Sequence, residues 1–518
     1  MTKQISYAAS GAASGASSER APKLAIANRG EVAVRIILAA QELGLTTVLL
    51  HSEVDTGTRA YRMADEKVCI GPATTADSYL RIDRNIEGAL AAGATMVHPG
   101  FGFLSENADF AQACVDAGLI FVGPKAETIR ALGDKISAKA LIEKANVPTV
   151  PGYAGKDQTI ETLTKECDRI GYPVIVKAAA GGGGRGMKVI GSRAEASELI
   201  SSAQREAKSA FGSAIVFLEK YLDHAKHIEF QVFGDFTGRC VHLFERECTV
   251  QRRHQKIVEE SLSPSLTPEL RTEMARAAVG LAEKAGYQGA GTVEFLVQDG
   301  EYYFLEMNTR LQVEHPVTEM VLGVDLVKAQ ILTAMKAFRI WKQAELVPRG
   351  HAIECRVYAE DSYNRGLPST GELLGLHWPE GPGRRYEVGF EAGDEVTSYY
   401  DPMIAKVIVW DEDRPRAIRK MLRTLDDSVI FGVKANLPYL KAILTHPDFL
   451  DGTMTTQFIS KYFPEGLEAR ELSGAQTAFA AVAAAGAGGA NSHGASGSAL
   501  RAGSDALSAP WSAGWRFV

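Results

Sequence analysis

The sequence predicts a protein of the α/β and α+β classes, in which three folded segments follow one another along the chain. Short apolar runs alternate with helical patterns near the N-terminus, a glycine run lies between two short strands, and a long strand-rich stretch follows. Alternating strands and helices are typical of a parallel sheet, whereas consecutive strands favour antiparallel pairing. Both kinds of sheet are therefore expected in a chain of 518 residues, which is long enough for several buried cores.

The first folded segment, residues 22–122, is expected to be a doubly wound domain. An apolar run is followed by a helical pattern and a second apolar run, at the spacing of a strand–helix–strand unit. Such units connect parallel strands. The expected strands are Lys23–Ala27, Thr46–His51, Met96–His98 and Ile120–Val122.

Three segments follow the first domain. Residues 123–150 are expected to form linker helices. Residues 151–221 should form a small lid, with strands Pro173–Lys177 and Met187–Ile190 on either side of the glycine run. Residues 222–466 show repeated alternating patterns, which predict the largest domain.

The two ends of the chain differ in composition from the rest. Residues 1–21 and 467–518 are rich in Ala, Gly and Ser, and such segments bury too little apolar surface to offset the entropy of ordering. We expect both to be disordered tails. The aromatic residues Trp511, Trp515 and Phe517 either dock on a partner or are incidental in a solvated tail.

Composition excludes several classes of function. The net charge of -7 disfavours a nucleic-acid partner, because phosphate backbones recruit basic surfaces. The sequence contains no apolar run of about 18 residues that would span a membrane, and its beginning lacks the apolar core of a secretory signal. The six cysteines form no CxxC pair, which predicts reduced thiols and a cytoplasmic protein.

The first chemical signal is Lys177, which is followed by glycines at 181–184 and 186. Glycines allow backbone N–H groups to approach phosphate oxygens closely. A Walker loop is excluded, because GK[ST] is absent and a strand rather than a helix follows. The pattern predicts a hairpin that folds over a triphosphate, although a glycine run alone is about as often a simple flexible loop.

The second signal is a set of oxygen ligands formed by Glu294, Glu306 and Asn308. Two strands surround Asp299-Gly300, a hairpin turn signal. A regular two-residue turn would place the two carboxylates on opposite faces, whereas an odd loop or a bulge places them on one face. The apolar pattern favours the second register, with Val293, Phe295, Val297, Tyr303, Leu305 and Met307 on the core face. Such a set suits Mg²⁺, although two solvated acids on an exposed sheet face are the alternative.

The third signal is a group of charged residues around this predicted site. Arg310 and Glu314 follow directly on Asn308, the run 251–256 reads QRRHQK, and Arg356 lies downstream. Charge runs usually mark solvated faces, but here the charges would lie close to a metal and to anionic phosphates. The turn-rich segment 98–107 is expected to be a loop at the carboxyl end of a strand, where α/β sheets often bind ligands.

A series of ordered motifs extends along the chain: ANRGE at 27–31, HPGFGFLSEN at 98–107, GPKAETI at 123–129, GDK at 133–135, KAAAGGGGRGM at 177–187, EKYL at 219–222, QRRHQK at 251–256, EMNTRLQVEHPVTE at 306–319 and ECR at 354–356. Together they resemble the biotin carboxylase family, from about residue 22 to residue 466. The resemblance implies an ATP-grasp fold with an N-terminal Rossmann-like domain, a mobile lid and a large C-terminal domain.

The resemblance also implies an ATP site. Phosphates or ribose would be contacted by Lys135, Lys177 and His227, and adenine would lie against the segment of EKYL. The implied nucleotide-binding residues are Lys135, Lys177, Gly183, Gly184, Glu219, Lys220, Leu222, His227, Gln251 and His254. Glu294 and Glu306, supported by Asn308, would hold Mg²⁺ or Mn²⁺ at the phosphates.

The implied reaction has two steps. Bicarbonate would lie against Arg310, Gln312 and the backbone of Val313, and Glu314 would remove its proton so that it attacks the γ-phosphorus of ATP. Lys256 and the arginines would stabilise the spreading negative charge. The carboxyphosphate would release CO₂ in a closed site.

Phosphate would then take the N1 proton of biotin, and N1 would attack the CO₂. Arg356 would stabilise the biotin enolate.

Members of the family usually carry Tyr where this chain has Phe101, and residues 365–375 also depart from the common form. The missing hydroxyl is expected to alter docking of the carrier without removing activity.

Biotin is expected to arrive on a separate carrier. Full-length members attach it to a Lys in an AMKM-like hairpin near the C-terminus, and the AMK found here, at 334–336, falls inside a helical stretch. We expect a biotinylated carboxyl carrier protein or domain in trans, a carboxyltransferase subunit and a homodimer. Acetyl-, propionyl-, other acyl-CoA and pyruvate systems share this half-reaction.

Two other functions are open at this point. Another ATP-grasp ligase that forms an acyl phosphate would use the same metal ligands but lack the combination of Arg310, Glu314 and Arg356. A regulatory ATP-binding subunit would have lost a metal carboxylate or Glu314. All of these residues are present.

Overall fold

The N-terminal part of the chain contains a parallel sheet, as the sequence predicts. The computed structural model describes residues 22–133, 135–178, 187–253 and 255–468. Five strands pair in the order β3-β2-β1-β4-β5, and every pairing is parallel. Their bounds are β1 Lys23–Ile26, β2 Thr46–Ser52, β3 Glu66–Gly71, β4 Met96–His98 and β5 Ile120–Phe121. The edge strand β3 was not predicted, because its residues alternate between exposed and half-buried positions and carry little apolar signal.

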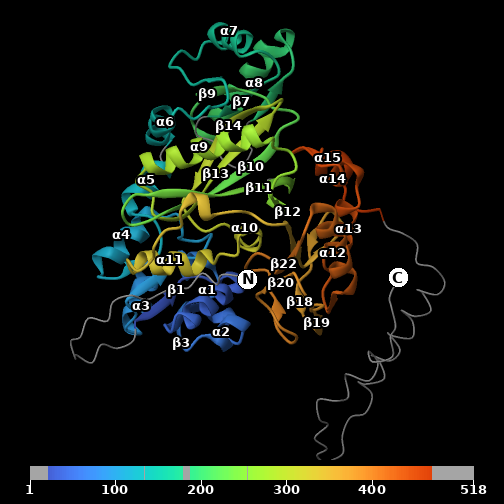
Figure 1. Ribbon diagram of the computed structural model, residues 1–518. Coiled ribbons are helices and arrows are strands. Elements are labelled where there is room, and N and C mark those ends of the chain that lie inside the picture. The colour runs from blue at the N-terminus through green and yellow to red at the C-terminus, as the bar shows by residue number, and fades with distance from the viewer. Residues whose placement is uncertain (1–21, 134, 179–186, 254, 469–518) are drawn as a thin grey trace, which may run out of the picture. The chain divides into compact units, whose positions relative to one another are not determined.

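Helices cover this sheet because each has an apolar face. Helix α1 buries Val32, Ile36 and Ile37 against the sheet core. The helices of this part are α1 Gly30–Glu42, α2 Arg59–Met63, α3 Ile82–Ala91 and α4 Ala108–Asp116, followed by α5 Ala126–Gly133 and α6 Lys135–Lys144 (Figure 1). His98 is the last residue of β4 and residues 99–107 follow it directly, so the predicted loop lies at the carboxyl end of a parallel strand.

A second, smaller sheet lies within residues 151–221. Its four strands pair in the order β6-β9-β7-β8, and all of their pairings are antiparallel. Two amphipathic helices pack on it through residues such as Leu163 and Ile200. The bounds are β6 Gly152–Tyr153, α7 Ile160–Ile170, β7 Val174–Ala178, β8 Lys188–Ile190, α8 Arg193–Phe211 and β9 Val216–Lys220. The glycine run lies outside the described residues.

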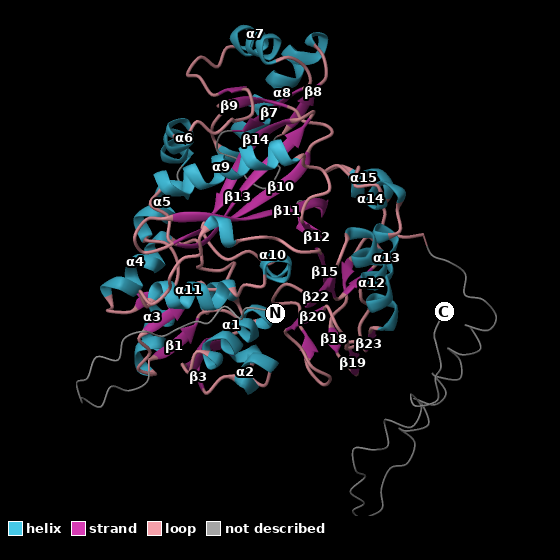
Figure 2. Cartoon of the chain, viewed as in Figure 1, coloured by secondary structure: helices cyan, strands magenta, loops and turns pink. Residues whose placement is uncertain are grey.

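The largest sheet is antiparallel and has eight strands, in the order β14-β13-β10-β11-β12-β15-β22-β20. Helix α9 packs on one of its faces (Figure 2). There Met274, Ala278 and Leu281 share a core with Phe230 and Phe295. The strand bounds are β10 Lys226–Gly234, β11 Cys240–Arg252, β12 Gln255–Ser261, β13 Gly289–Gln298, β14 Glu301–Asn308, β15 His351–Tyr358, β20 Arg384–Val388 and β22 Met403–Asp411.

Helices and short strands complete the region up to residue 468. The helices are α9 Pro268–Lys284, α10 His315–Leu322, α11 Leu326–Ala334, α12 Arg414–Asp427, α13 Leu437–Leu444, α14 Pro447–Leu450 and α15 Phe458–Tyr462. Three two-stranded sheets are formed by β16 Glu360–Asp361 with β17 Leu367–Pro368, β18 Gly371–Glu372 with β21 Glu395–Val396, and β19 Gly375–His377 with β23 Val429–Phe431.

Two details bear on the sequence predictions. The tripeptide at 334–336 lies at the end of α11 rather than inside it, since Ala334 is the last helical residue and Lys336 has a φ of 58°. Among the described residues, every helix is too short or too polar to cross a lipid bilayer. The domain boundaries stated above remain predictions.

Candidate active site

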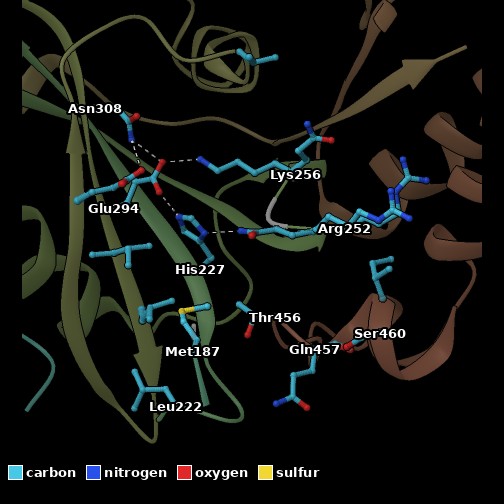
Figure 3. A pocket seen from close by; sticks show the side chains of 18 of the residues that line it. Met187, Leu222, His227, Arg252, Lys256, Glu294, Asn308, Thr456, Gln457 and Ser460 are labelled. Carbon is cyan, nitrogen blue, oxygen red and sulfur yellow. Dashed lines mark hydrogen bonds and ion pairs between the residues drawn. The ribbon is translucent and has the colours of Figure 1, made fainter. Parts of the chain in front are cut away.

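A cavity of about 1700 Å³ lies between the small sheet and the large sheet. Lys177 and Glu219 line it from the small sheet, and His227, Glu294 and Arg356 from the large sheet. Figure 3 shows that Lys256 and His227 both reach toward Glu294 from different strands. Most of the predicted site residues that the structure describes therefore line one cavity.

The two candidate metal carboxylates lie on one face of the sheet, as predicted. Asp299 and Gly300 form the two-residue turn, with φ values of 54° and 80°. The strands then pair regularly up to Phe295 with Phe304, after which Glu294 pairs with Glu306. Leu305 is therefore the extra residue of a β-bulge, which is one of the two arrangements that the apolar pattern allowed.

The bulge also corrects part of the prediction. Tyr302 and Phe304, rather than Tyr303 and Leu305, belong to the core face near the turn, and Leu305 is 44% exposed. The error has a physical reason: side chains alternate along a strand only as far as a bulge, where the alternation changes phase. Met307 returns to the core beyond the bulge.

Carboxylates stand side by side across three strands, because Glu294 pairs with Glu306 on β14 and with Glu229 on β10. Glu229 forms ion pairs with Arg246, through Nε at 2.5 Å, and with Lys256, through Nζ at 2.5 Å. Like charges placed directly opposite each other are destabilising, so such a row needs cations. The sequence analysis did not name Glu229 or Arg246 as site residues. The signal for Glu229 was the alternation of polar and apolar residues along β10, which places Glu229 on the same face as His227.

Glu306 is the member of this row that lacks a cation. Among the described residues, Asn308 donates to its Oε1 at 3.4 Å, and no Lys, Arg or His reaches it within salt-bridge distance. Partial burial and the nearby Glu294 and Glu106 raise the pKa of Glu306, whose side chain remains exposed to the cavity. A divalent cation would relieve this repulsion, so the donor set of two carboxylates and one amide fits a hard metal ion.

Glu294 is held ionised by its neighbours. Burial alone would raise the pKa of Glu294, but Lys256 and His227 hold it well below its usual range. Nζ of Lys256 lies 2.8 Å from Oε1, and Nε2 of His227 lies 2.7 Å from Oε2. Asn308 also donates to Oε1, at 2.9 Å.

Glu314 is fully buried at the start of α10 and receives two cations. Nζ of Lys256 lies 2.7 Å from Oε1, and Nη2 of Arg356 lies 2.9 Å from Oε2. Burial would raise the pKa of Glu314, but Lys256, Arg356 and Arg246 lower it well below its usual range. The side chain is therefore an ionised carboxylate across neutral pH, which is the state that can accept a proton.

Arg356 is paired on both sides. Besides Glu314, it contacts Glu259 of the neighbouring strand, with Nε 2.6 Å from Oε1. Burial raises the pKa of Glu259 to about 7, against the opposing effect of Arg356. Glu259 was not predicted, because nothing local in the sequence marks it as the partner of a residue 97 positions away.

The loop between β14 and α10 carries the remaining predicted anion-binding residues. Arg310 donates to Gln312 Oε1 at 3.1 Å and to Asn308 Oδ1 at 2.9 Å, and Gln312 donates to Glu294 Oε1 at 2.9 Å. Glu106, from the segment after β4, accepts from Nε of Arg310 at 2.9 Å. The sequence predicted only that residues 98–107 form a loop where ligands often bind. The contact between Glu106 and Arg310 was not predicted.

The predicted nucleotide residues are brought together only in part. Lys177 forms an ion pair with Glu219, and Gln251 lies 2.5 Å from Nδ1 of His227. Lys220 donates to the backbone carbonyls of Gly171 and Tyr172, between α7 and β7, and Leu222 lines the cavity. Gly183, Gly184, His254 and the side chain of Lys135 lie outside the described residues.

Two sheets face a shared cavity. The cavity holds a carboxylate site suited to a divalent cation, and next to that site lie several positively charged side chains and an ionised base. Such an arrangement suits the binding of a metal nucleotide beside a small anion, and it defines the class of ATP-grasp enzymes that activate an anion with ATP.

The comparisons with known proteins identify the family within this class. The family model for the N-terminal domain of biotin carboxylase matches residues 20–129, and the model for its C-terminal domain matches residues 354–461. The ATP-binding domain of the carbamoyl-phosphate synthase L chain matches residues 134–337. The three matches follow one another along the chain without overlap.

Relatives and solved structures agree with these matches. The biotin carboxylase of Nostoc is 47% identical over 440 residues, which are 85% of this chain and 98% of that protein. The α subunit of mitochondrial methylcrotonoyl-CoA carboxylase from Dictyostelium discoideum is 48% identical over 84% of this chain, and this chain spans 63% of that subunit.

The biotin carboxylase domain of 2-oxoglutarate carboxylase from Hydrogenobacter thermophilus, solved as a dimer with MgADP, ADP and bicarbonate, superimposes with a TM-score of 0.78. Its sequence identity is 42%, and the match covers 86% of this chain and 99% of that domain. This chain belongs to the biotin carboxylase family and is an ATP-dependent ligase.

Proposed function

We propose that the cavity binds ATP and bicarbonate next to each other and that its residues carry out the carboxylation of biotin. One observation carries the proposal: the ammonium of Lys256 joins Glu294 and Glu314 at 2.8 and 2.7 Å. The candidate metal ligand and the candidate base are therefore parts of one buried cluster. In such a site, charges act on each other strongly because water is largely excluded.

The nucleotide is proposed to lie between the small and the large sheet. Glu294 and Glu306, with Asn308 in support, would hold Mg²⁺ or Mn²⁺, which supplies positive charge at the phosphate oxygens. Lys177 and His227 would contact phosphates or ribose from opposite sides of the cavity. Glu219, Lys220 and Leu222 would frame the adenine, the glycine run would fold over the triphosphate, and Gln251 would add to the nucleotide site.

Bicarbonate is proposed to bind where the loop between β14 and α10 opens to the cavity. The guanidinium of Arg310, the amide of Gln312 and the backbone N–H of Val313 would hold its oxygens. Glu314 would accept its proton, and the oxygen so freed would form a bond to the γ-phosphorus while ADP leaves. Lys256 lies against Glu314 and would stabilise the negative charge that develops.

The second step is the transfer of CO₂ to biotin. Carboxyphosphate would break into CO₂ and phosphate inside the cavity, and phosphate would take the proton from N1 of biotin. Arg356 would stabilise the negative oxygen of the biotin enolate while N1 bonds to CO₂. The buried position of Arg356, beside Glu314, supports a role close to the same substrate.

Biotin is proposed to arrive on a biotinylated carrier protein or domain, with a carboxyltransferase subunit receiving the carboxyl group. The relatives include subunits of methylcrotonoyl-CoA and pyruvate carboxylases, so the final acceptor is proposed only as an acyl-CoA or a 2-oxo acid. We also propose a homodimer and a cytoplasmic location. The dimer of the Hydrogenobacter domain and the free state of all six cysteines support these two proposals.

The test is ATP cleavage measured with and without bicarbonate, and then with free biotin added. We expect bicarbonate to be required for cleavage and biotin to accelerate it. Carboxybiotin, trapped with ¹⁴C-bicarbonate, should accumulate only when ATP and Mg²⁺ are present. Cleavage at the same rate without bicarbonate would contradict the proposal.

A further inference from the structure

Lys406 is a fully buried cation on β22 that the mechanism above does not use. Its Nζ donates to the backbone carbonyl of Val313 at 2.7 Å and pairs with Glu387 of β20 at 2.5 Å. Its side chain has no exposed surface. A buried ammonium is costly unless it is paired and hydrogen-bonded, so these contacts account for its charge.

The carbonyl that Lys406 holds belongs to the loop that carries the proposed bicarbonate site. The carbonyl of Val313 and the N–H of Glu314 lie in one rigid peptide plane. Fixing this carbonyl therefore fixes the rotation between Val313 and Glu314, and with it the direction in which the Glu314 side chain leaves the backbone. The other end of that side chain is held by Lys256 and Arg356.

Other contacts hold the loop at different points. Glu106 accepts from the backbone N–H of Thr309 at 2.9 Å, and Nδ1 of His315 lies 2.8 Å from the carbonyl of Gln312. Among the hydrogen bonds of the described residues, Lys406 is the side chain that holds Val313 itself. This contact is charge-assisted, and such hydrogen bonds are about twice as strong as neutral ones.

The position of Lys406 is itself fixed by charged and aromatic neighbours. Glu387 also lies 3.5 Å from Nε of Arg35, a residue of α1 in the N-terminal domain. The ring of Phe101, in the loop after β4, lies 5.8 Å from Nζ of Lys406. The ammonium is therefore held between three segments that are far apart in the sequence.

We propose that Lys406 is a positioning residue of the carboxylation site: by holding the Val313 carbonyl, and with it the peptide plane that leads into Glu314, it directs the Glu314 carboxylate toward the proton of bicarbonate. This inference rests on the proposed function. It assigns Lys406 no contact with ATP, the metal ion or biotin.

The test compares Lys406→Met with a matched control in helix α12, which packs against β22. Methionine keeps the length of the side chain but removes the charge and the N–H donors. Lys420→Met is the control, because Nζ of Lys420 also donates to a backbone carbonyl, that of Trp410 at 2.8 Å, and pairs with Asp411 at 3.0 Å. Lys420 does not line the cavity.

We expect Lys406→Met to raise the KM for bicarbonate and to lower kcat, each by about tenfold, while the KM for ATP stays within about twofold. Lys420→Met should change neither KM. Lys406→Arg, which keeps a charged donor, should recover most of the affinity for bicarbonate. ADP binding and circular dichroism check that each variant is folded.

Two outcomes would overturn the inference. One is a KM for bicarbonate within about twofold of wild type in folded Lys406→Met; the other is an equal rise of both KM values, which a general loss of structure would cause. If Lys406→Met does not fold, the double variant Lys406→Met/Glu387→Gln carries the test, because it leaves no unpaired buried charge, and an unchanged KM for bicarbonate in that variant would overturn the inference. A wild-type enzyme that cleaves ATP without bicarbonate would instead contradict the proposed function.

Discussion

At the scale of single residues, the central feature is an ammonium shared by three buried carboxylates. Lys256 lies within 2.5–2.8 Å of Glu229, Glu294 and Glu314. Burial lowers the pKa of Lys256, but the carboxylates outweigh it and raise the pKa well above its usual range. Lys256 therefore stays charged, and its charge keeps Glu314 ionised before any substrate binds.

The first prediction concerns Glu314. We expect Glu314→Gln to reduce bicarbonate-dependent ATP cleavage by at least about 10²-fold, because the amide cannot accept the proton, while ADP affinity remains nearly unchanged. The matched control is Glu245→Gln, which alters a buried glutamate of β11 that pairs with Arg271 at 2.8 Å outside the cavity. Equal losses of turnover and nucleotide binding would contradict the assignment of the base.

The second prediction concerns Arg356. We expect Arg356→Ala to impair biotin carboxylation at least about tenfold more than bicarbonate-dependent ATP cleavage, because only the former needs a stabilised enolate. Both rates are measured on the same preparation, with ¹⁴C-carboxybiotin and released phosphate as readouts. Arg384→Ala, on β20 and hydrogen-bonded to Thr424, is the control. A matching collapse of both rates would count against the role in the second step.

At the scale of elements, the hairpin of β13 and β14 determines whether the metal ligands meet. The turn and the bulge act together. With the two-residue turn alone, Glu294 would pair with Leu305, but the bulge at Leu305 makes Glu294 pair with Glu306. The turn requires a positive φ at both Asp299 and Gly300. Glycine adopts such a conformation at no steric cost, unlike a β-branched residue.

The third prediction tests this turn. We expect Gly300→Val to lower the free energy of unfolding by about 1–2 kcal/mol, because a β-branched residue is strained at a positive φ. An added Cβ would meet no atom within 4 Å, so the change reports strain rather than a clash. Gly280→Ala in α9, which also meets no atom within 4 Å, should instead raise stability slightly. Equal melting temperatures for the two variants would contradict the strain at Gly300.

At the scale of the whole molecule, buried charges connect the N-terminal domain to the large sheet. Arg35 of α1 lies 3.1 Å from Glu319 of α10 and 2.7 Å from Asp325.

His98 lies fully buried at the end of β4, and its Nδ1 accepts a hydrogen bond from the N–H of Gly100 at 3.0 Å. Burial, and then the charge of Arg35, lower the pKa of His98 to about 3.

The fourth prediction follows from this buried histidine. Between pH 6.5 and pH 3 the unfolded chain binds a proton at His98 that the folded protein excludes, so the stability that neutral His98 provides falls as the pH falls. Relative to His98→Gln, wild type should therefore lose about 2 kcal/mol of unfolding free energy between pH 7 and pH 5. Chemical unfolding at each pH measures the difference, and His224→Gln serves as the surface control. A pH-independent difference between wild type and His98→Gln would show that the burial argument is wrong.

The sequence by itself determined the features that depend on neighbouring residues. Alternation of strands and helices predicted the parallel sheet, the apolar pattern predicted that Glu294 and Glu306 share a face, and the ordered motifs predicted the family. Each of these signals lies within a short stretch of chain, where the periodicity of the backbone decides which side chains point the same way.

Only the tertiary structure decided which charges meet. Glu106 contacts Arg310 across 204 positions of sequence, Glu259 contacts Arg356 across 97, and Lys406 contacts Val313 across 93. The bulge at Leu305 likewise depends on pairing with a neighbouring strand. The physical reason is that a buried charge is stable only beside its partner, and the partner is chosen by the packing of sheets whose strands lie far apart in the sequence.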